Sequence, residues 1–268
     1  MTSEYSAGRD FISGAKINYF HHALKHLTSY AIHPSINVLS NVCRIADLGT
    51  QTAIWPTDVV ETISTGTKFH VDGFDISDKF FPPSAWLPEN VKLYIHDIYQ
   101  PFPEEFKGQF EVVHLRLFLT LSRQQVVQIL QNALELLKPG GCIQWMEHDK
   151  TDMTIMEVTA NSSSTANQAF NELQLNPFPN YNARWVLDIG STMTSVGLEV
   201  LAEDRIPTKP WLLPQMNELH LLALMDIPQG LSSAVDEFCE KHLQGLQEEY
   251  QNGVATIDGF ICVVGRKP

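Results

Sequence analysis

Acidic side chains directly follow three short apolar segments of the sequence. Asp47 opens the run of residues 47–53, and Asp75 and Asp97 end the next two segments. A carboxylate can accept hydrogen bonds from both hydroxyls of a ribose or from an exocyclic amine. Asp75 comes about 26 residues after Gly49, a spacing that is typical of a ribose-binding acid. Capping of a helix or simple solvation of a loop acid would explain the same spacing.

A second group of residues offers acid–base chemistry. His148, flanked by Glu147 and Asp149, follows the fifth apolar segment and could take a proton from a reacting group. His21, in the first helical segment, is a further candidate base if that helix folds over the site. A loop histidine without a role and a surface histidine of an amphipathic helix are the alternatives. The four cysteines form no Cys-x-x-Cys pair, so we expect buried free thiols and no metal site.

Short apolar runs alternate with helical patterns along the chain. The runs are rich in β-branched and aromatic residues, as buried parallel strands are. The clearest helix is predicted at residues 122–137, where Ser122 and Gln125 have the spacing of a capping box and the apolar residues share one face. Strands are expected at residues 42–48, 69–76, 91–95, 110–115, 142–146, 198–206 and 259–266, and further helices at 10–30, 55–63, 185–196, 215–224 and 231–251.

This alternation predicts an α/β fold with right-handed βαβ units, in which ligands bind at the carboxyl ends of the strands. We expect a Rossmann-like, mostly parallel sheet of seven strands with helices on both faces. The 268 residues fit a single domain. Its expected parts are an N-terminal helical cap (1–40), a cofactor-binding core (41–150), a lid inserted after the fifth strand (151–197) and the C-terminal part of the sheet (198–268).

The overall charge and the lack of long apolar segments indicate which kinds of partner the protein binds. A net charge of −13 and an isoelectric point near 5.1 oppose nucleic-acid binding, because phosphate neutralisation needs clustered Lys and Arg. No apolar run reaches the roughly 18 residues of a membrane span, and residues 1–9 lack the apolar core of a signal peptide. We therefore expect a cytoplasmic protein that acts on a small molecule, without a nucleic-acid or membrane partner, and the oligomeric state stays open.

Several motifs follow one another in a recognisable order. They are Ile32-His33-Pro34-Ser35-Ile36, Asp47-Leu48-Gly49-Thr50, Gly73-Phe74-Asp75-Ile76-Ser77, His96-Asp97-Ile98 with Pro101-Phe102-Pro103, Val112-Val113-His114-Leu115-Arg116, Lys138-Pro139-Gly140-Gly141 and Gln144-Trp145. Together they resemble the class I S-adenosylmethionine-dependent methyltransferases, and more narrowly the small methyltransferases of fungal secondary metabolism. The resemblance covers nearly the whole chain and is strongest from about residue 30 to 150.

The resemblance implies S-adenosylmethionine as the cofactor. The first strand end would hold its amino-acid part, the second its ribose and the third its adenine, while the fourth would pass close to the methionine portion. The residues implied are Asp47, Gly49, Thr50 and Gln51 at the first strand, Asp75 and Ile76 at the second, Asp97 and Ile98 at the third, and Leu115 and Arg116 at the fourth.

The glycine loop departs from the family pattern. The family's loop reads Gly-x-Gly-x-Gly, whereas the second and third glycines are replaced here by Gln51 and Ala53. Crowding of the cofactor by the Gln51 side chain would cost about 1–3 kcal/mol, or roughly tenfold to hundredfold in affinity. The Gln51 side chain could instead point outward or hydrogen-bond the cofactor.

The resemblance implies transfer of a methyl group from S-adenosylmethionine to an oxygen, nitrogen or sulfur atom of a small, fairly apolar secondary metabolite. The alternative is a degenerate methyltransferase fold that acts as a cyclase, pericyclase or isomerase without methyl transfer, which the altered glycine loop favours. A non-catalytic regulatory partner is a third reading, because fold alone does not decide function. Apolar lid residues could line an acceptor pocket or form ordinary core: Phe170, Phe178, Tyr181, Trp185 and Met193.

Overall fold

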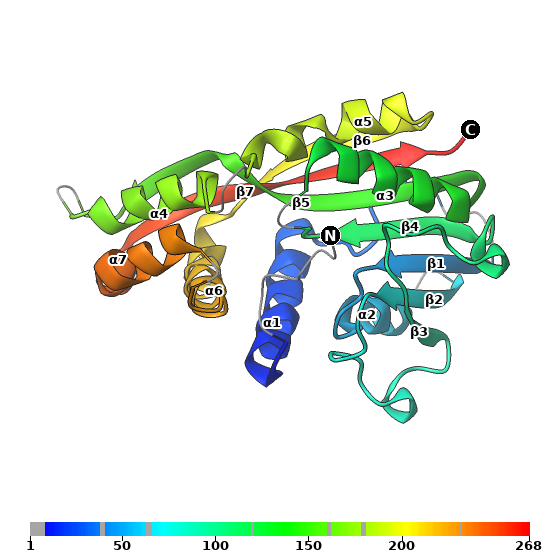
Figure 1. The fold of residues 1–268 in the computed structure, drawn as a ribbon, viewed down its shortest axis with the longest axis horizontal. Coiled ribbons are helices and arrows are strands. Elements are labelled where there is room, and N and C mark those ends of the chain that lie inside the picture. Colours follow the sequence, from blue (N-terminus) through cyan, green and yellow to red (C-terminus); the bar gives the residue numbers. More distant parts are fainter. Residues whose placement is uncertain are drawn as a thin grey trace. The chain divides into compact units, whose positions relative to one another are not determined.

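The structure is a computed structural model that describes residues 9–37, 41–62, 66–118, 121–159, 162–177, 181–230 and 232–268. Its sheet has seven strands in the order β3-β2-β1-β4-β5-β7-β6 (Figure 1), which confirms the Rossmann-like sheet expected from the sequence. The strands are β1 (Val42–Leu48), β2 (Lys68–Asp75), β3 (Val91–Ile95), β4 (Phe110–Arg116), β5 (Leu137–Glu157), β6 (Glu199–Pro207) and β7 (Val254–Arg266).

Strands β1 to β5 pair in parallel. Strand β1 lies between β2 and β4, and five of its seven residues are buried, as expected for an apolar run inside a parallel sheet. Asp47 pairs in register with Gly73 on one side and His114 on the other, and Asp75 pairs with Ile95. The carboxyl ends of these four strands therefore meet at the edge where α/β sheets bind ligands.

Strands β5 and β7 are longer than the sequence predicts, with 21 and 13 residues. Gly140 and Gly141 exchange backbone hydrogen bonds with Lys267, and Val158 donates to Gly253, so the two strands run antiparallel. Residues 151–157 consequently belong to β5, which extends beyond the predicted strand, and the lid expected over residues 151–197 stays a prediction. Antiparallel pairing satisfies the backbone of this polar segment, which has no apolar run that would mark it as a strand.

Most helices begin and end near their predicted residues. The capping box is present, since the Ser122 hydroxyl accepts from the Gln125 backbone N–H at 3.3 Å and the Gln125 side chain accepts from Ser122 N–H at 2.8 Å. The helix expected at 185–196 is a 3₁₀ segment (Ala183–Asp188) followed by α5. The α-helices are α1 (Phe11–Thr28), α2 (Ile54–Thr62), α3 (Arg123–Leu136), α4 (Thr165–Leu175), α5 (Ile189–Ser195), α6 (Leu213–Met225) and α7 (Ser233–Gln251).

The chain divides into two compact units. We call the first the sheet unit (Thr28–His148, Trp185–Arg205 and Ile261–Pro268) and the second the helical unit (Met1–Leu27, Asp149–Arg184 and Ile206–Phe260). The interpretation of the chain as one domain stays a prediction. No helix in the described ranges has the length and apolar character of a membrane span.

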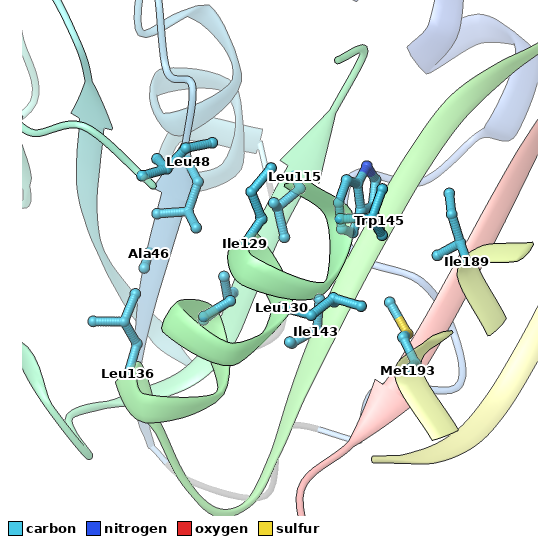
Figure 2. Close-up of a cluster of buried hydrophobic side chains, with 14 of the residues drawn as sticks. Ala46, Leu48, Leu115, Ile129, Leu130, Leu136, Ile143, Trp145, Ile189 and Met193 are labelled. Atoms are coloured by element: carbon cyan, nitrogen blue, oxygen red, sulfur yellow. The ribbon is translucent and has the colours of Figure 1, made fainter. Parts of the chain in front are cut away.

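The sheet unit has an apolar core on each face of its strands. On one face α3 and α5 cover β1, β4 and β5, as the side chains of Leu130, Trp145 and Met193 illustrate (Figure 2). On the other face α2 packs through Trp55 and Val59. Helices on both faces are therefore confirmed, and they hold the carboxyl ends of β1 to β4 in place.

Three of the apolar residues predicted in a lid are part of the hydrophobic cores of the two units. Trp185 and Met193 lie in the core of the sheet unit, and Phe170 lies in the core that α4, α6 and α7 form in the helical unit. Tyr181 is half-buried with the Lys150 ammonium 5.8 Å from its ring centroid, and Phe178 lies outside the described residues. Phe170, Trp185 and Met193 are therefore ordinary core residues. They do not support the prediction that the molecule accepting the methyl group is apolar.

Candidate functional site

The loop after β1 keeps a glycine-type backbone without two of the glycines. Gly49, Gln51 and Ala53 all have positive φ angles, of 77°, 48° and 57°. Residues with a Cβ rarely adopt this region, because it costs them roughly 1–2 kcal/mol. Backbone N–H groups of Gly49 and Thr50 donate to the carbonyl of Phe74 at 2.8 and 3.0 Å, which ties the loop to the end of β2. The fold thus imposes the Gly-x-Gly-x-Gly conformation on a sequence that only partly suits it.

Two glycines make room around this loop. A Cβ on Gly49 would lie 3.0 Å from the Phe118 ring, and a Cβ on Gly73 would lie 2.6 Å from the hydroxyl oxygen of Thr50. Thr50 is 5% exposed, and its buried hydroxyl has no hydrogen-bond partner among the described residues. A buried hydroxyl without a hydrogen-bond partner is energetically costly, so a ligand or a water molecule that hydrogen-bonds to Thr50 would stabilise the loop.

Asp75 is joined directly to the glycine loop. Its carboxylate accepts from the backbone N–H groups of Gln51 at 3.0 Å and Ser77 at 3.2 Å. The side chain is partly exposed, and an ionised carboxylate has about four acceptor positions, so it can serve both the loop and a ligand hydroxyl. Ile76, the next residue, is 44% exposed at the same edge.

Asp97 lies on the neighbouring strand end. The His96 backbone N–H donates to the Asp75 carbonyl at 2.8 Å, which places the segment after β3 beside the end of β2. The Asp97 carboxylate accepts from the Tyr99 N–H at 3.0 Å and is partly exposed, while Ile98 is buried. The structure therefore brings both predicted acids to one edge of the sheet unit.

Asp47 takes part in a buried polar cluster. Its carboxylate lies 2.7 Å from Nδ1 of His114, and the His114 ring stacks on Trp55 with the centroids 3.7 Å apart and the planes 2° from parallel. Burial lowers the pKa of His114 below 6.5, and the hydrogen bond to Asp47 opposes this shift only in part. Burial also lowers the pKa of Arg116 to about 10, against the attraction of Asp47 and Asp58. Trp55, Asp58 and His114 were not predicted as site residues, because nothing in their spacing along the chain links a helix face to a strand.

This burial predicts a pH dependence of stability. The unfolded chain binds a proton on His114 near pH 6.5, whereas the folded protein binds it only at lower pH. The free energy of unfolding should therefore fall below pH 6.5, with His114 contributing up to about 1.4 kcal/mol per pH unit. Urea denaturation of wild type and His114→Gln between pH 5 and 8 isolates this contribution, since glutamine can donate to Asp47 without titrating. Equal slopes for the two proteins would contradict it.

The segment after β4 is held by Glu147. The Glu147 carboxylate is 2% exposed, and its Oε1 accepts from the Trp145 indole at 2.6 Å and from the Phe118 backbone N–H at 2.9 Å. Leu115 is fully buried in the core, so its side chain packs away from the edge. Among the predicted site residues, Glu147 and Leu115 thus have clear packing roles.

His148 and His21 lie in different surroundings. The prediction that His148 ends the fifth strand is wrong, because β5 continues to Glu157. However, Arg116 pairs with Met146, so Glu147 and His148 are the first β5 residues beyond the end of β4, and His148 is half-buried. His21 belongs to α1 in the helical unit, where it is buried and its ring lies edge-on to that of His22.

The helical unit contains a buried histidine, His220, that was not among the predicted site residues. His220 Nε2 lies 2.9 Å from Asp258, and the other Asp258 oxygen accepts from the Thr208 hydroxyl at 2.7 Å. Nothing in the sequence marked the pair, because 38 residues separate its members.

Sequence relatives of the chain carry methyltransferase names. Methyltransferase grgD of a Penicillium species is 38% identical over 143 residues, which cover 50% of this chain and 49% of that protein. N-methyltransferase sirN of Leptosphaeria maculans is 25% identical over 99% of this chain and 95% of its own length. The chain is therefore similar in sequence to fungal proteins that are named methyltransferases. For grgD and two further methyltransferase relatives, the match spans about half of their length or less.

Solved structures show the same fold at low sequence identity. The [4+2]-cyclase SpnF has a TM-score of 0.53 at 15% identity, and the match covers 96% of this chain and 95% of SpnF. Phosphoethanolamine N-methyltransferase 2 of Haemonchus contortus, in complex with S-adenosylmethionine, has a TM-score of 0.54 at 13% identity over all of this chain and 58% of that one. The chain therefore has the methyltransferase fold, which both a cyclase and a methyltransferase share. No protein-family profile matches the chain.

Proposed function

We propose that this relative of the fungal methyltransferases transfers a methyl group from S-adenosylmethionine to an oxygen, nitrogen or sulfur atom of a small secondary metabolite. One observation carries the proposal: the loop after β1 keeps the backbone of a nucleoside-binding glycine loop and is hydrogen-bonded to Asp75 through Gln51. Residues held at unfavourable φ angles by their surroundings cluster at ligand-binding sites, and Gln51 and Ala53 are two such residues in this loop.

The residues at this edge suit the cofactor. The buried Thr50 hydroxyl lacks a hydrogen-bond partner within the described part of the chain. The partly exposed carboxylates of Asp75 and Asp97 can accept from ribose hydroxyls and an adenine amine. Asp47 and Arg116 would lie near the charged methionine portion, with Gly49 and Gln51 beside them. S-adenosylmethionine supplies an electrophilic methyl group on a sulfonium.

The chain's own contribution would be positioning and proton removal. A bound nucleophile held in line with the methyl group gains most of its rate from orientation. His148, just beyond the end of β4 and half-buried, is the proposed proton acceptor when the nucleophile is a weak acid. Glu147 would act through the position of the segment at Phe118 and not as a base, because its Oε1 holds that segment in place. His21 stays a predicted second base.

The competing function is a cyclisation or rearrangement on the same fold without methyl transfer. Calorimetric titration with S-adenosylmethionine separates the two, and we expect binding with a micromolar Kd. Absence of binding up to millimolar concentration would contradict methyl transfer. The same titration of Gln51→Gly tests whether the Gln51 side chain crowds the cofactor. If it does, the glycine variant should bind S-adenosylmethionine about tenfold more tightly than wild type. Unchanged affinity would show that the side chain points away.

A further inference from the structure

The segment after β4 carries an aromatic ring back over the glycine loop. Phe118 lies two residues beyond the end of β4, and its ring contacts Gly49, which directly follows the neighbouring strand β1. A Cβ built on Gly49 would lie 3.0 Å from the ζ carbon at the far end of the ring and 3.5 and 3.8 Å from the two ε carbons. The first distance is shorter than an ordinary carbon–carbon contact, so the ring can lie this close only because glycine has no side chain.

The Phe118 ring is well supported in this place. The Leu117 backbone N–H donates to the Met146 carbonyl at 3.0 Å, and the Phe118 N–H donates to the buried Glu147 carboxylate at 2.9 Å. The ring also packs edge-on against that of Trp145, with the centroids 6.1 Å apart and the planes at 74°. Leu117 has a φ angle of 62°, and non-glycine residues held in this strained region cluster at ligand-binding sites. The ring therefore forms a fixed wall beside the glycine loop.

Part of this wall is open to a ligand. The Phe118 side chain is half-buried and follows the carboxyl end of β4, so a molecule that lies on the turn at Gly49 would meet the exposed part of the ring. A phenyl ring has no polar atoms and gains most from contact with methylene groups, which leave water when they pack on it. Ribose hydroxyls and an adenine amine need acceptors instead, and Asp75 and Asp97 offer these at the neighbouring strand ends.

We propose that Phe118 is a specificity-determining residue that selects the amino-acid end of the cofactor. The inference rests on the proposed binding of S-adenosylmethionine. In that molecule two methylene groups join the sulfur to the amino-acid end, and the Phe118 ring packs against them while Gly49 leaves room for the ring. S-adenosylhomocysteine has the same two methylenes without the positive charge. 5′-Methylthioadenosine has the same adenosine and sulfur but lacks the amino-acid end, so it does not meet the ring.

Calorimetric titration with these three ligands tests the selection. Phe118→Ala should weaken S-adenosylmethionine and S-adenosylhomocysteine by about tenfold, because two methylenes lose their apolar contact, and 5′-methylthioadenosine by less than about twofold. Phe118→Leu keeps part of the apolar contact, so the loss for the first two ligands should be about threefold. Trp86→Ala is the matched control, since it removes an exposed aromatic ring from the same unit, and it should bind all three ligands as wild type does.

A double-mutant cycle tests the contact between the ring and the glycine turn. Gly49→Ala should push the Phe118 ring toward the ligand and weaken S-adenosylmethionine binding. Phe118→Leu in the same protein should restore part of that loss, since leucine lacks the ζ carbon that the new Cβ would meet. Losses that simply add would contradict the inference, because independent residues give additive changes.

The outcomes separate this inference from the proposed function. If none of the three ligands binds wild type, the proposed function fails and the inference fails with it. If S-adenosylmethionine binds wild type, and Phe118→Ala either leaves its affinity within about twofold or weakens all three ligands equally, the inference is wrong while cofactor binding stands. Where Phe118→Ala does not fold, or 5′-methylthioadenosine binds too weakly to compare, the cycle of Gly49→Ala with Phe118→Leu decides the question.

Discussion

Asp75→Ala is expected to weaken S-adenosylmethionine binding by about a hundredfold or more. Hydrogen bonds to a charged acceptor contribute about 1.5–3 kcal/mol each, and a ribose presents two hydroxyls to this carboxylate. About 3 kcal/mol corresponds to somewhat more than a hundredfold in Kd. The substitution also removes the acceptor of the Gln51 backbone N–H and so loosens the glycine loop. Calorimetric titration of the variant measures the loss.

Asp78→Ala is the matched control for this variant. Asp78 is an exposed acid three residues beyond Asp75, so its removal changes the net charge equally without touching the loop. Its affinity should stay within about twofold of wild type, because a surface charge is largely screened by salt. An Asp75→Ala protein that is folded and binds S-adenosylmethionine as tightly as wild type would exclude Asp75 from the cofactor site.

Two substitutions at Glu147 should differ widely in stability. Glu147→Ala leaves the Trp145 indole N–H and the Phe118 backbone N–H buried without their acceptor, and each costs about 1–3 kcal/mol. We expect the free energy of unfolding to fall by about 2–5 kcal/mol, a large part of the stability of a typical protein. Glu147→Gln keeps an Oε1 that can accept both bonds and should lose less than about 1.5 kcal/mol. Urea denaturation measures both changes.

The Glu147→Ala and Glu147→Gln variants also show whether Glu147 acts through its accepting oxygen or through its charge. If Glu147 acts only through Oε1, Glu147→Gln also keeps its affinity for S-adenosylmethionine. A glutamine variant as unstable as the alanine variant would show that the carboxylate charge, and not its accepting oxygen, stabilises the segment after β4. In that case the packing account of Glu147 is wrong.

Local sequence was sufficient for elements whose causes are local. β1 and β3 have the predicted bounds, because a short apolar run between polar turns has few other ways to bury itself. The capping box at Ser122 begins α3 as expected, since its hydrogen bonds join residues three apart. For β5 the predicted strand ended at residue 146, whereas the observed strand continues to Glu157. Its last residues are polar and their partner, β7, is distant in the chain, so no local pattern marks them as a strand.

The alternation of short apolar runs with helical patterns determined the fold class. The positions of Asp75 and Asp97 after two of these runs determined the edge at which they meet, because parallel strands bring their carboxyl ends together whatever the intervening lengths. Only the tertiary structure decided the environment of each group. It placed His114 between Asp47 and Trp55, gave the Glu147 carboxylate two buried donors, and imposed positive φ angles on Gln51 and Ala53. Burial and pairing arise between residues far apart in the chain, so no local pattern of residue types could reveal them.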